Sequence, residues 1–178
     1  MAVLGIDDTA AIVGARCWLE AACFELLGGW VSTVPEPAAK LLLARHSRHH
    51  GEHAELLAGV LPATRAHDPA RLVAPSDERW VAALAAARGA DGDATVERLA
   101  GAYQSLLPRL VGDADLLLDE TRPWCDGPLA RRLLVVLEDE RADLAEGLTL
   151  LETLLAAGGD PDRVARRRAA VGAALPAR

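Results

Sequence analysis

The chain has 178 residues, which is enough for one domain, residues 1–178, with a single substantial core. Its formal net charge of −7 argues against nucleic acid as a partner, because a nucleic-acid backbone is itself strongly negative. About half of the residues are apolar, but alanine and leucine dominate and aromatic residues are few. Because alanine and leucine are strong helix formers, this composition predicts an all-α protein.

The sequence also predicts where the protein works. No apolar run approaches the roughly 20 residues that a membrane-spanning helix needs, so we expect no membrane segment. The N-terminus carries Asp7 and Asp8 and has no basic stretch followed by an apolar core, so no signal peptide is expected. We therefore expect a cytoplasmic protein. Its cysteines, Cys17, Cys23 and Cys125, lack metal-type spacing and are expected to be reduced and mostly buried.

The first two predicted helices, about residues 8–32 and 36–60, form a hairpin. Pro35 and Pro37 place a turn between them, because each disfavours a helical conformation in the residue before it. In the first helix an apolar stripe repeats at steps of four and three residues, which is the pattern of one packed helix face. The stripe consists of Val13, Cys17, Glu20, Phe24, Leu27 and Val31.

A long crossover, about residues 61–93, is expected to join this hairpin to a third helix, about residues 94–122. The crossover contains one short helical candidate, residues 76–88, for which Ser76 is a suitable N-cap. Pro108 lies inside the third helix and predicts a kink or break about one turn before it.

The fourth predicted helix covers about residues 128–157 and ends at Gly158 and Gly159. A short C-terminal helix, about residues 161–174, follows with Asp160 as its N-cap. Two long hairpins joined by a crossover predict an antiparallel four-helix bundle.

Four of the five histidines lie in the second predicted helix. Three of them belong to a stripe with steps of 4, 3, 4, 3 and 4, which consists of Leu42, His46, His49, His53, Leu56 and Val60. An imidazole on a packed face needs a hydrogen-bond partner, a charge partner or a metal. His50 lies beside this stripe, and we expect it at the surface or at its boundary.

The polar stripe residues are expected at similar heights along the bundle. Glu20 lies 14 residues before the first turn and His49 lies 15 after it, which is roughly 21 to 23 Å in both cases. Asp113 lies 12 residues before the second turn and Glu140 lies 15 after it, or roughly 18 to 23 Å. We therefore expect a layer of carboxylates and imidazoles near the middle of the bundle.

This layer has two interpretations. It is either a metal site or a metal-free hydrogen-bond network that fixes how the helices pack. In the first interpretation Glu20, His49, His53 and Glu140 are the expected ligands. His46 and Asp143 are then further ligands or hydrogen-bond partners of the ligands.

The order of these polar residues resembles the ferritin-like superfamily of four-helix bundles. More narrowly, three segments look like a group of actinobacterial ferritin-like proteins, and together the resemblance covers roughly residues 8–157. The segments are Phe24-Glu-Leu-Leu-Gly-Gly-Trp-Val, His49-His50-Gly-Glu-His53-Ala-Glu-Leu and Asp139-Glu140-x-x-Asp143.

The resemblance implies a di-iron or di-manganese centre that activates oxygen or peroxide, and hence an oxidase or hydroxylase that acts on a small molecule. The Glu-x-x-His pair of the family occurs in neither half of this chain, and the second half offers only carboxylates. We therefore expect either one metal ion, iron or manganese with zinc as the alternative, or a metal-free bundle that serves as a binding or scaffold protein. A homodimer is also open. An exposed Trp30, Trp80 or Trp124 would mark its face, but each of the three is expected to be packed within the chain.

Overall fold

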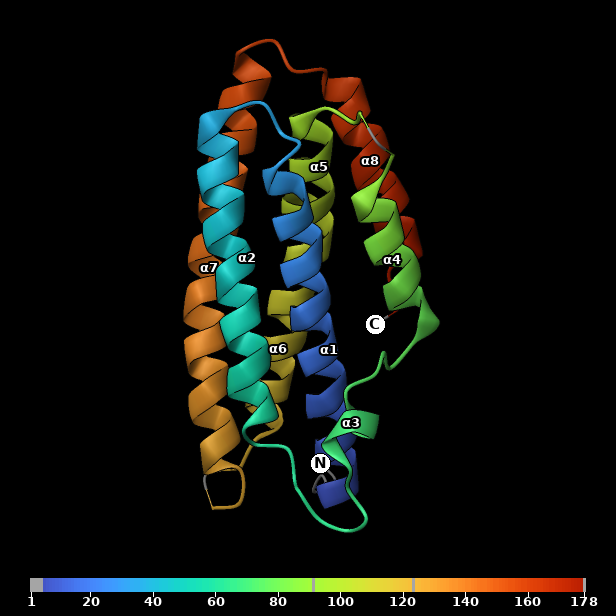
Figure 1. Ribbon diagram of the computed structural model, residues 1–178, viewed down its shortest axis with the longest axis vertical. Helices are drawn as coiled ribbons and strands as arrows, with labels where there is room; N and C mark the ends of the chain where they lie inside the picture. The colour runs from blue at the N-terminus through green and yellow to red at the C-terminus, as the bar shows by residue number, and fades with distance from the viewer. Residues whose placement is uncertain (1–4, 91, 123, 178) are drawn as a thin grey trace.

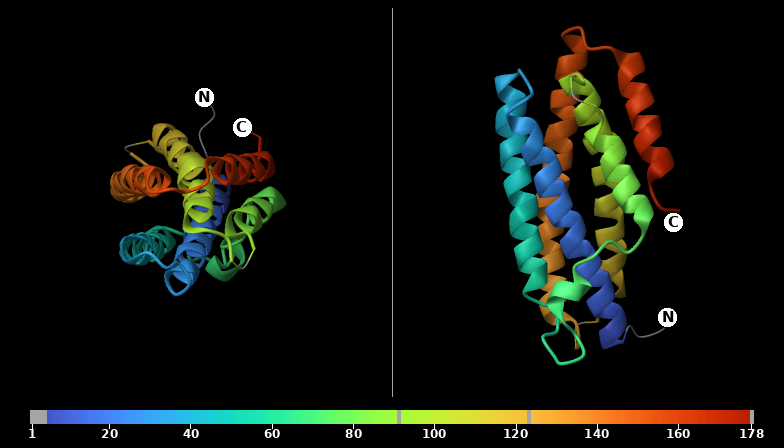
Figure 2. Two further views of the ribbon diagram at one scale, coloured as in Figure 1. Left: turned by 90° about the horizontal axis from the view of Figure 1, so that it is seen from above. Right: turned by 45° about the vertical axis from the view of Figure 1, so that its right-hand side comes forward.

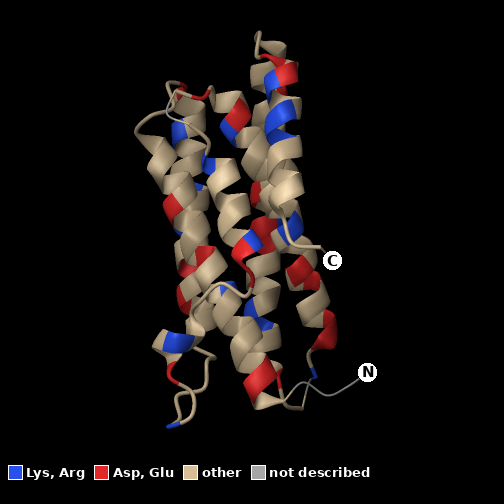
Figure 3. Ribbon diagram, turned by 90° about the vertical axis from the view of Figure 1, so that its right-hand side faces the viewer, with Lys and Arg blue, Asp and Glu red and all other residues tan. Residues whose placement is uncertain are grey.

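The computed structural model describes residues 5–90, 92–122 and 124–177. All regular elements in these ranges are helical, so the all-α prediction is confirmed. None of the described helices is long and apolar enough to cross a membrane. In the view of Figure 3 acidic and basic residues are interspersed along the helices.

Long helical segments lie side by side along the longest axis of the molecule (Figure 1). The first two form a hairpin. The third is a column of three consecutive helical elements, and the fourth runs antiparallel to that column. These segments are α1 (Ile6–Val31), α2 (Pro37–Ala58), the column of α5 (Thr95–Gly101), η1 (Ala102–Leu106) and α6 (Leu107–Glu120), and α7 (Gly127–Ala156). The hairpin turn after α1 is where Pro35 and Pro37 place it.

The crossover carries more helix than the sequence predicted. It contains α3 (Pro69–Leu72) and α4 (Glu78–Arg88), and α4 climbs back along the molecule so that the α5 column runs in the same direction as α2 (Figures 1 and 2). Asp77, and not Ser76, is the N-cap of α4, because its carboxylate accepts a hydrogen bond from the backbone N–H of Arg79 at 2.8 Å.

The C-terminal helix α8 (Pro161–Ala174) packs beside α4 and α5. Its predicted cap is confirmed: the Asp160 carboxylate accepts hydrogen bonds from the backbone N–H groups of Asp162 and Arg163. Gly158, in the turn before it, has a φ of 109°, a conformation that favours glycine.

A π-helical turn, η1, interrupts the third column directly before Pro108. The ring nitrogen of Pro108 has no hydrogen to donate. The backbone N–H of the preceding residue, Leu107, donates to the carbonyl oxygen of Ala102, five residues earlier, which is the hydrogen bond of a π helix. The predicted kink or break before Pro108 therefore takes the form of a π turn. Tyr103 lies in this turn and is fully buried opposite Gly147 of α7.

Two apolar clusters fill the interior at different heights. The lower one includes Val13, Leu57, Leu117, Leu133 and Val136. The upper one is larger and includes Leu27, Leu43, Leu99, Leu106 and Leu151. On α2 and α7 the two clusters are separated by the turns that carry the predicted polar residues, and on α1 they meet next to Glu20.

The cysteine and tryptophan predictions have mixed outcomes. Cys17 and Cys23 are buried as expected, whereas Cys125 is exposed because it lies in the turn before α7. Of the tryptophans considered for a dimer face, Trp30 and Trp80 are packed inside the chain and Trp124 is 96% exposed.

Candidate metal centre

Four potential metal ligands meet between the two apolar clusters. Glu20 comes from α1, His50 and His53 come from α2, and Glu140 comes from α7. Each offers one ligand atom, these atoms all lie within 4.8 Å of one another, and none of the four residues is more than 1% exposed. Two atoms bound to one metal at about 2.1 Å are at most about 4.2 Å apart, so small side-chain rotations would bring the four onto one ion.

The prediction that His50 lies at the surface or its boundary is wrong. The buried face of α2 passes through Leu43, His46, His50, His53 and Leu57, at steps of three and four residues. This face contains His46 and His53 of the predicted stripe. At its other positions it passes through the next residue in sequence, Leu43, His50 and Leu57 in place of Leu42, His49 and Leu56. Its centre faces α1, where Nδ1 of His50 lies 2.6 Å from Oε2 of Glu20.

Arg16 is, after His50, the second site residue that was not predicted. Its side chain is only 6% exposed, and its Nε donates to Oε1 of Glu20 at 2.7 Å. One terminal nitrogen pairs with Oε1 of Glu140, and the other donates to the carbonyl oxygen of Leu110 at 2.6 Å. The spacing of Arg16 and Glu20, four residues apart on one helix face, was the available signal for this ion pair.

Arg16 fixes how both carboxylates are turned. Oε1 of each glutamate accepts a hydrogen bond from the guanidinium, and Oε2 of each remains available to the other groups of the site. Oε2 of Glu20 faces the two imidazoles, at 2.6 Å from Nδ1 of His50 and 3.6 Å from Nδ1 of His53. Groups that orient ligands in this way are a regular feature of metal sites.

Three buried polar atoms of the cluster have no hydrogen-bond partner among the described residues. They are Nε2 of His50, Nδ1 of His53 and Oε2 of Glu140. The second ring nitrogen of His53 lies 3.2 Å from the carboxylate of Asp139, the carboxylate–histidine arrangement that commonly supports a metal-bound imidazole. A buried polar atom without a partner costs about 1–3 kcal/mol, and a metal ion would supply the missing partner for atoms of these types.

The two carboxylates differ in how readily they ionise. Burial alone raises the pKa of Glu20, but Arg16 and His50 lower it more, so the net pKa is well below the usual value. For Glu140 burial dominates over Arg16, and the charge of Glu20 adds to it, so that the pKa is raised to about 7. Burial lowers the pKa of Arg16, but the charges of Glu140 and Glu20 raise it by more than burial lowers it. The net pKa is therefore raised, and the guanidinium stays charged.

A second polar layer lies one turn away and contains the remaining predicted ligands. Asp143 bridges two imidazoles, at 3.2 Å from Nε2 of His46 and 2.9 Å from Nδ1 of His49. Nδ1 of His46 lies 2.8 Å from the hydroxyl of Tyr103. Burial and the nearby Arg45 lower the pKa of His46 to about 3, so this imidazole is neutral.

The predicted ligand set is therefore divided between two layers. Glu20, His53 and Glu140 meet in the four-residue cluster, together with the unpredicted His50. His46, His49 and Asp143 form the adjoining layer, and the side chain of His49 is 18% exposed.

Asp113 does not belong to either layer, contrary to the prediction. Its side chain is 32% exposed and forms an ion pair of 2.8 Å with Arg109, one turn earlier on α6. The buried face of α6 passes instead through Leu110, Ala114 and Leu117. The third column thus contributes a backbone carbonyl to Arg16 and no carboxylate to the cluster.

The chain matches no family model, no curated protein and no solved structure. The ferritin-like resemblance therefore depends on the residues of this chain alone. The geometry of the buried cluster carries the functional argument.

Proposed function

We propose that this protein is a ferritin-like metalloprotein that binds one transition-metal ion through Glu20, His50, His53 and Glu140. The observation that carries the proposal is the convergence of four buried potential ligands, three of which present an atom that has no hydrogen-bond partner in the described part of the chain. An isolated buried imidazole or carboxylate is costly, and a sequence that needed only an apolar core would place leucine there.

The donor set favours iron or manganese, with zinc as the alternative. Two imidazoles and two carboxylates form a mixed nitrogen and oxygen environment, which these three metals accept. One ion fits the charges better than two. The guanidinium of Arg16 already places a positive charge between Glu20 and Glu140, where a di-metal centre would need a second cation.

A redox-active metal at this site would supply electron exchange with oxygen or peroxide, and we propose an oxidase or hydroxylase that acts on a small molecule. The residues around the metal would orient its ligands. Arg16 keeps both carboxylates turned toward the imidazoles. Tyr103, His46, Asp143 and the partly exposed His49 form a chain of close polar contacts that leads from the interior toward solvent.

One observation favours a metal-free alternative, in which the bundle is a binding or scaffold protein. Arg16, Glu20, Glu140 and His50 already form a connected network of ion pairs and hydrogen bonds, in which Arg16 compensates much of the buried negative charge. In that case the polar layer specifies how α1, α2 and α7 pack.

Metal analysis separates the two proposals. The protein should be produced without a histidine tag and purified without a metal-affinity step, then analysed for metals as isolated and after anaerobic loading with ferrous iron. About one ion per chain is expected for a four-ligand site, whereas less than about one-tenth of an ion under both conditions would refute it.

Two neighbouring histidines provide a matched pair of variants. His50→Ala should abolish metal binding, because it removes a ligand from the cluster. His49→Ala should retain it, because His49 lies in the adjoining layer and contacts Asp143. Retention by the His50 variant with loss by the His49 variant would move the site to the adjoining layer.

A further inference from the structure

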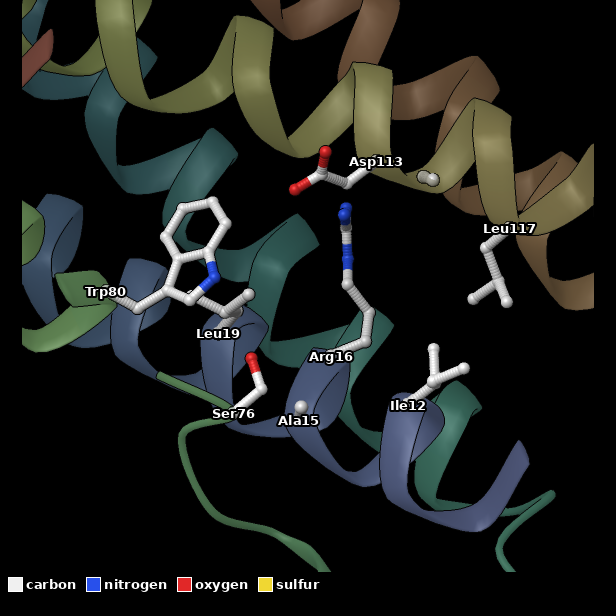
Figure 4. A pocket seen from close by; sticks show the side chains of 9 residues that line it. Ile12, Ala15, Arg16, Leu19, Ser76, Trp80, Asp113 and Leu117 are labelled. Atoms are coloured by element: carbon white, nitrogen blue, oxygen red, sulfur yellow. The ribbon is translucent and has the colours of Figure 1, made fainter. Parts of the chain in front are cut away.

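A small pocket lies against Arg16, between α1, α6 and the segment that leads into α4 (Figure 4). Its volume is about 160 Å³. Apolar side chains form most of its wall, notably Ile12, Leu19, Trp80 and Leu117. An apolar cavity of about 150 Å³ is large enough to hold benzene, so the pocket has room for a molecule of that size.

The pocket continues into a wider depression on the surface. Ile12, Trp80 and Leu117 line both spaces. Arg109 and Pro176, near the C-terminus, also line the wider depression. A small molecule can therefore reach Arg16 from solvent without any rearrangement of the helices.

Arg16 lines this pocket and has hydrogen-bond donors to spare. A guanidinium has five N–H bonds, and three of them are accounted for by Glu20, Glu140 and the carbonyl of Leu110. No described residue accepts a hydrogen bond from the other two. Figure 4 shows the side chain reaching from α1 across the pocket toward α6.

The charges around the pocket favour a neutral ligand. Arg16 is compensated by two carboxylates, so an additional anion would meet the field of Glu20 and Glu140. A cation would meet Arg16 itself. Asp113, at the pocket wall, is already paired with Arg109, whose guanidinium also lies 5.8 Å from the centre of the Trp80 ring.

We infer that this pocket binds a small neutral molecule, mainly apolar and about the size of benzene, through one carbonyl or hydroxyl oxygen that accepts a hydrogen bond from Arg16. Binding itself requires no metal. Its role as the substrate pocket rests on the proposed function, because Arg16 connects the pocket to the carboxylates of the cluster.

The binding test uses the full-length, metal-free protein and two probes of nearly equal shape. Cyclohexanone carries a carbonyl oxygen, and methylenecyclohexane carries a CH₂ group in its place. In an NMR titration we expect cyclohexanone to shift the indole N–H signal of Trp80 and the Nε–H signal of Arg16. Because a hydrogen bond to a charged donor is strong, cyclohexanone should bind at least about tenfold more tightly than the hydrocarbon.

Equal affinities for the two probes would overturn the role of Arg16 in recognition. The absence of shifts up to about 50 mM cyclohexanone would overturn the pocket, because even a weak ligand of seven heavy atoms should bind in that range. Neither result depends on metal content, so failure here is distinguishable from failure of the metal proposal.

Ala114→Leu should fill the pocket and abolish the cyclohexanone shifts, since Ala114 is a buried wall residue. Ala142→Leu is the matched control, because Ala142 is exposed on α7 and does not line the pocket. Should Ala114→Leu not fold, Ile12→Trp narrows the pocket from a residue that is 37% exposed. Full cyclohexanone binding by a folded pocket variant would contradict the assignment.

Discussion

Arg16 and Glu20 lie one turn apart on α1 and form an ion pair of 2.7 Å although both side chains are buried. The same guanidinium pairs with Glu140 on α7, so a single cation joins two helices and orients two carboxylates. Removing one member of a buried ion pair leaves an uncompensated charge in the interior. The Arg16 interaction is therefore the contact on which the geometry of the whole cluster depends.

Arg16→Met should lower the free energy of unfolding by about 3–5 kcal/mol, because Glu20 loses its cation and Glu140 loses its partner. Urea unfolding of the metal-free protein measures this change. Adding Glu20→Gln and Glu140→Gln to the variant should restore much of the loss. Arg141→Met is the control: its partly exposed pair with Asp115 should contribute less than about 1 kcal/mol.

Gly147→Ala should destabilise the protein by about 1–3 kcal/mol, because a methyl group at this position would overlap the ring of buried Tyr103. Displacing the ring should also break the contact between the Tyr103 hydroxyl and His46. Gly29→Ala, on α1, is the matched control: its added methyl group meets nothing within 4 Å and should be neutral or stabilising. Equal melting temperatures for the two variants would refute the close packing at Gly147.

His46 should make the metal-free protein less stable in acid. Burial, followed by the charge of Arg45, lowers its pKa to about 3 in the folded state, whereas an unfolded chain has a histidine pKa of about 6.5. Between these values the unfolded state binds the extra proton. The stability contributed by neutral His46 is thus fully present above about pH 6.5 and is lost, by about 1.4 kcal/mol per pH unit, as the pH falls toward 3.

The comparison with His46→Asn isolates this effect, because other titrating groups are common to both proteins and largely cancel. Asparagine retains an acceptor for the Tyr103 hydroxyl but does not titrate. The stability advantage of the unmodified protein over the variant should shrink as the pH falls from about 7 to about 5. A constant difference across that range would show that His46 is not held neutral.

Metal binding should strengthen as the pH rises toward neutrality. Burial raises the pKa of Glu140 to about 7, so below that pH a metal ion must displace its proton. The apparent affinity for Zn²⁺ should fall by about tenfold per pH unit below about pH 7 for each displaced proton. Calorimetry in two buffers of different ionisation enthalpy gives the number of protons released. Affinity and proton release that do not change between about pH 8 and pH 6 would exclude Glu140 as a ligand.

Much of the helical framework could be predicted because local chemistry marks its ends. Pro35 and Pro37 separate α1 from α2, and the Asp160 carboxylate caps α8. These features act within a few residues of the chain. The choice of Ser76 over Asp77 as the cap of α4 failed by one residue, because both side chains can serve and only the folded backbone selects between them.

The sequence predicted which helix carries the imidazoles of the site, but the buried face of α2 could be predicted only to within one residue. Histidines at positions 46, 49, 50 and 53 cover an arc that fits two neighbouring faces of the same helix. Packing against Glu20 of α1 selects the face that contains His50 and leaves His49 at its edge. This selection is a tertiary effect that periodicity within α2 does not contain.

Asp113 was misplaced because steps of three and of four residues both continue a helical stripe. From Leu110 a step of three reaches Asp113 and a step of four reaches Ala114, and the next step from either one reaches Leu117. The structure buries Ala114 and leaves Asp113 at the wall of the pocket. Packing of α6 against its neighbours makes this choice, which periodicity within the helix does not contain.

The most direct measurement is anomalous diffraction from crystals of the untagged protein loaded with iron, manganese or zinc, recorded on both sides of the absorption edge of the metal. The account predicts one anomalous peak enclosed by Glu20, His50, His53 and Glu140, with Arg16 still paired to both carboxylates. A loaded crystal without a peak at that position, or with a peak only in the layer of His46, His49 and Asp143, would contradict it.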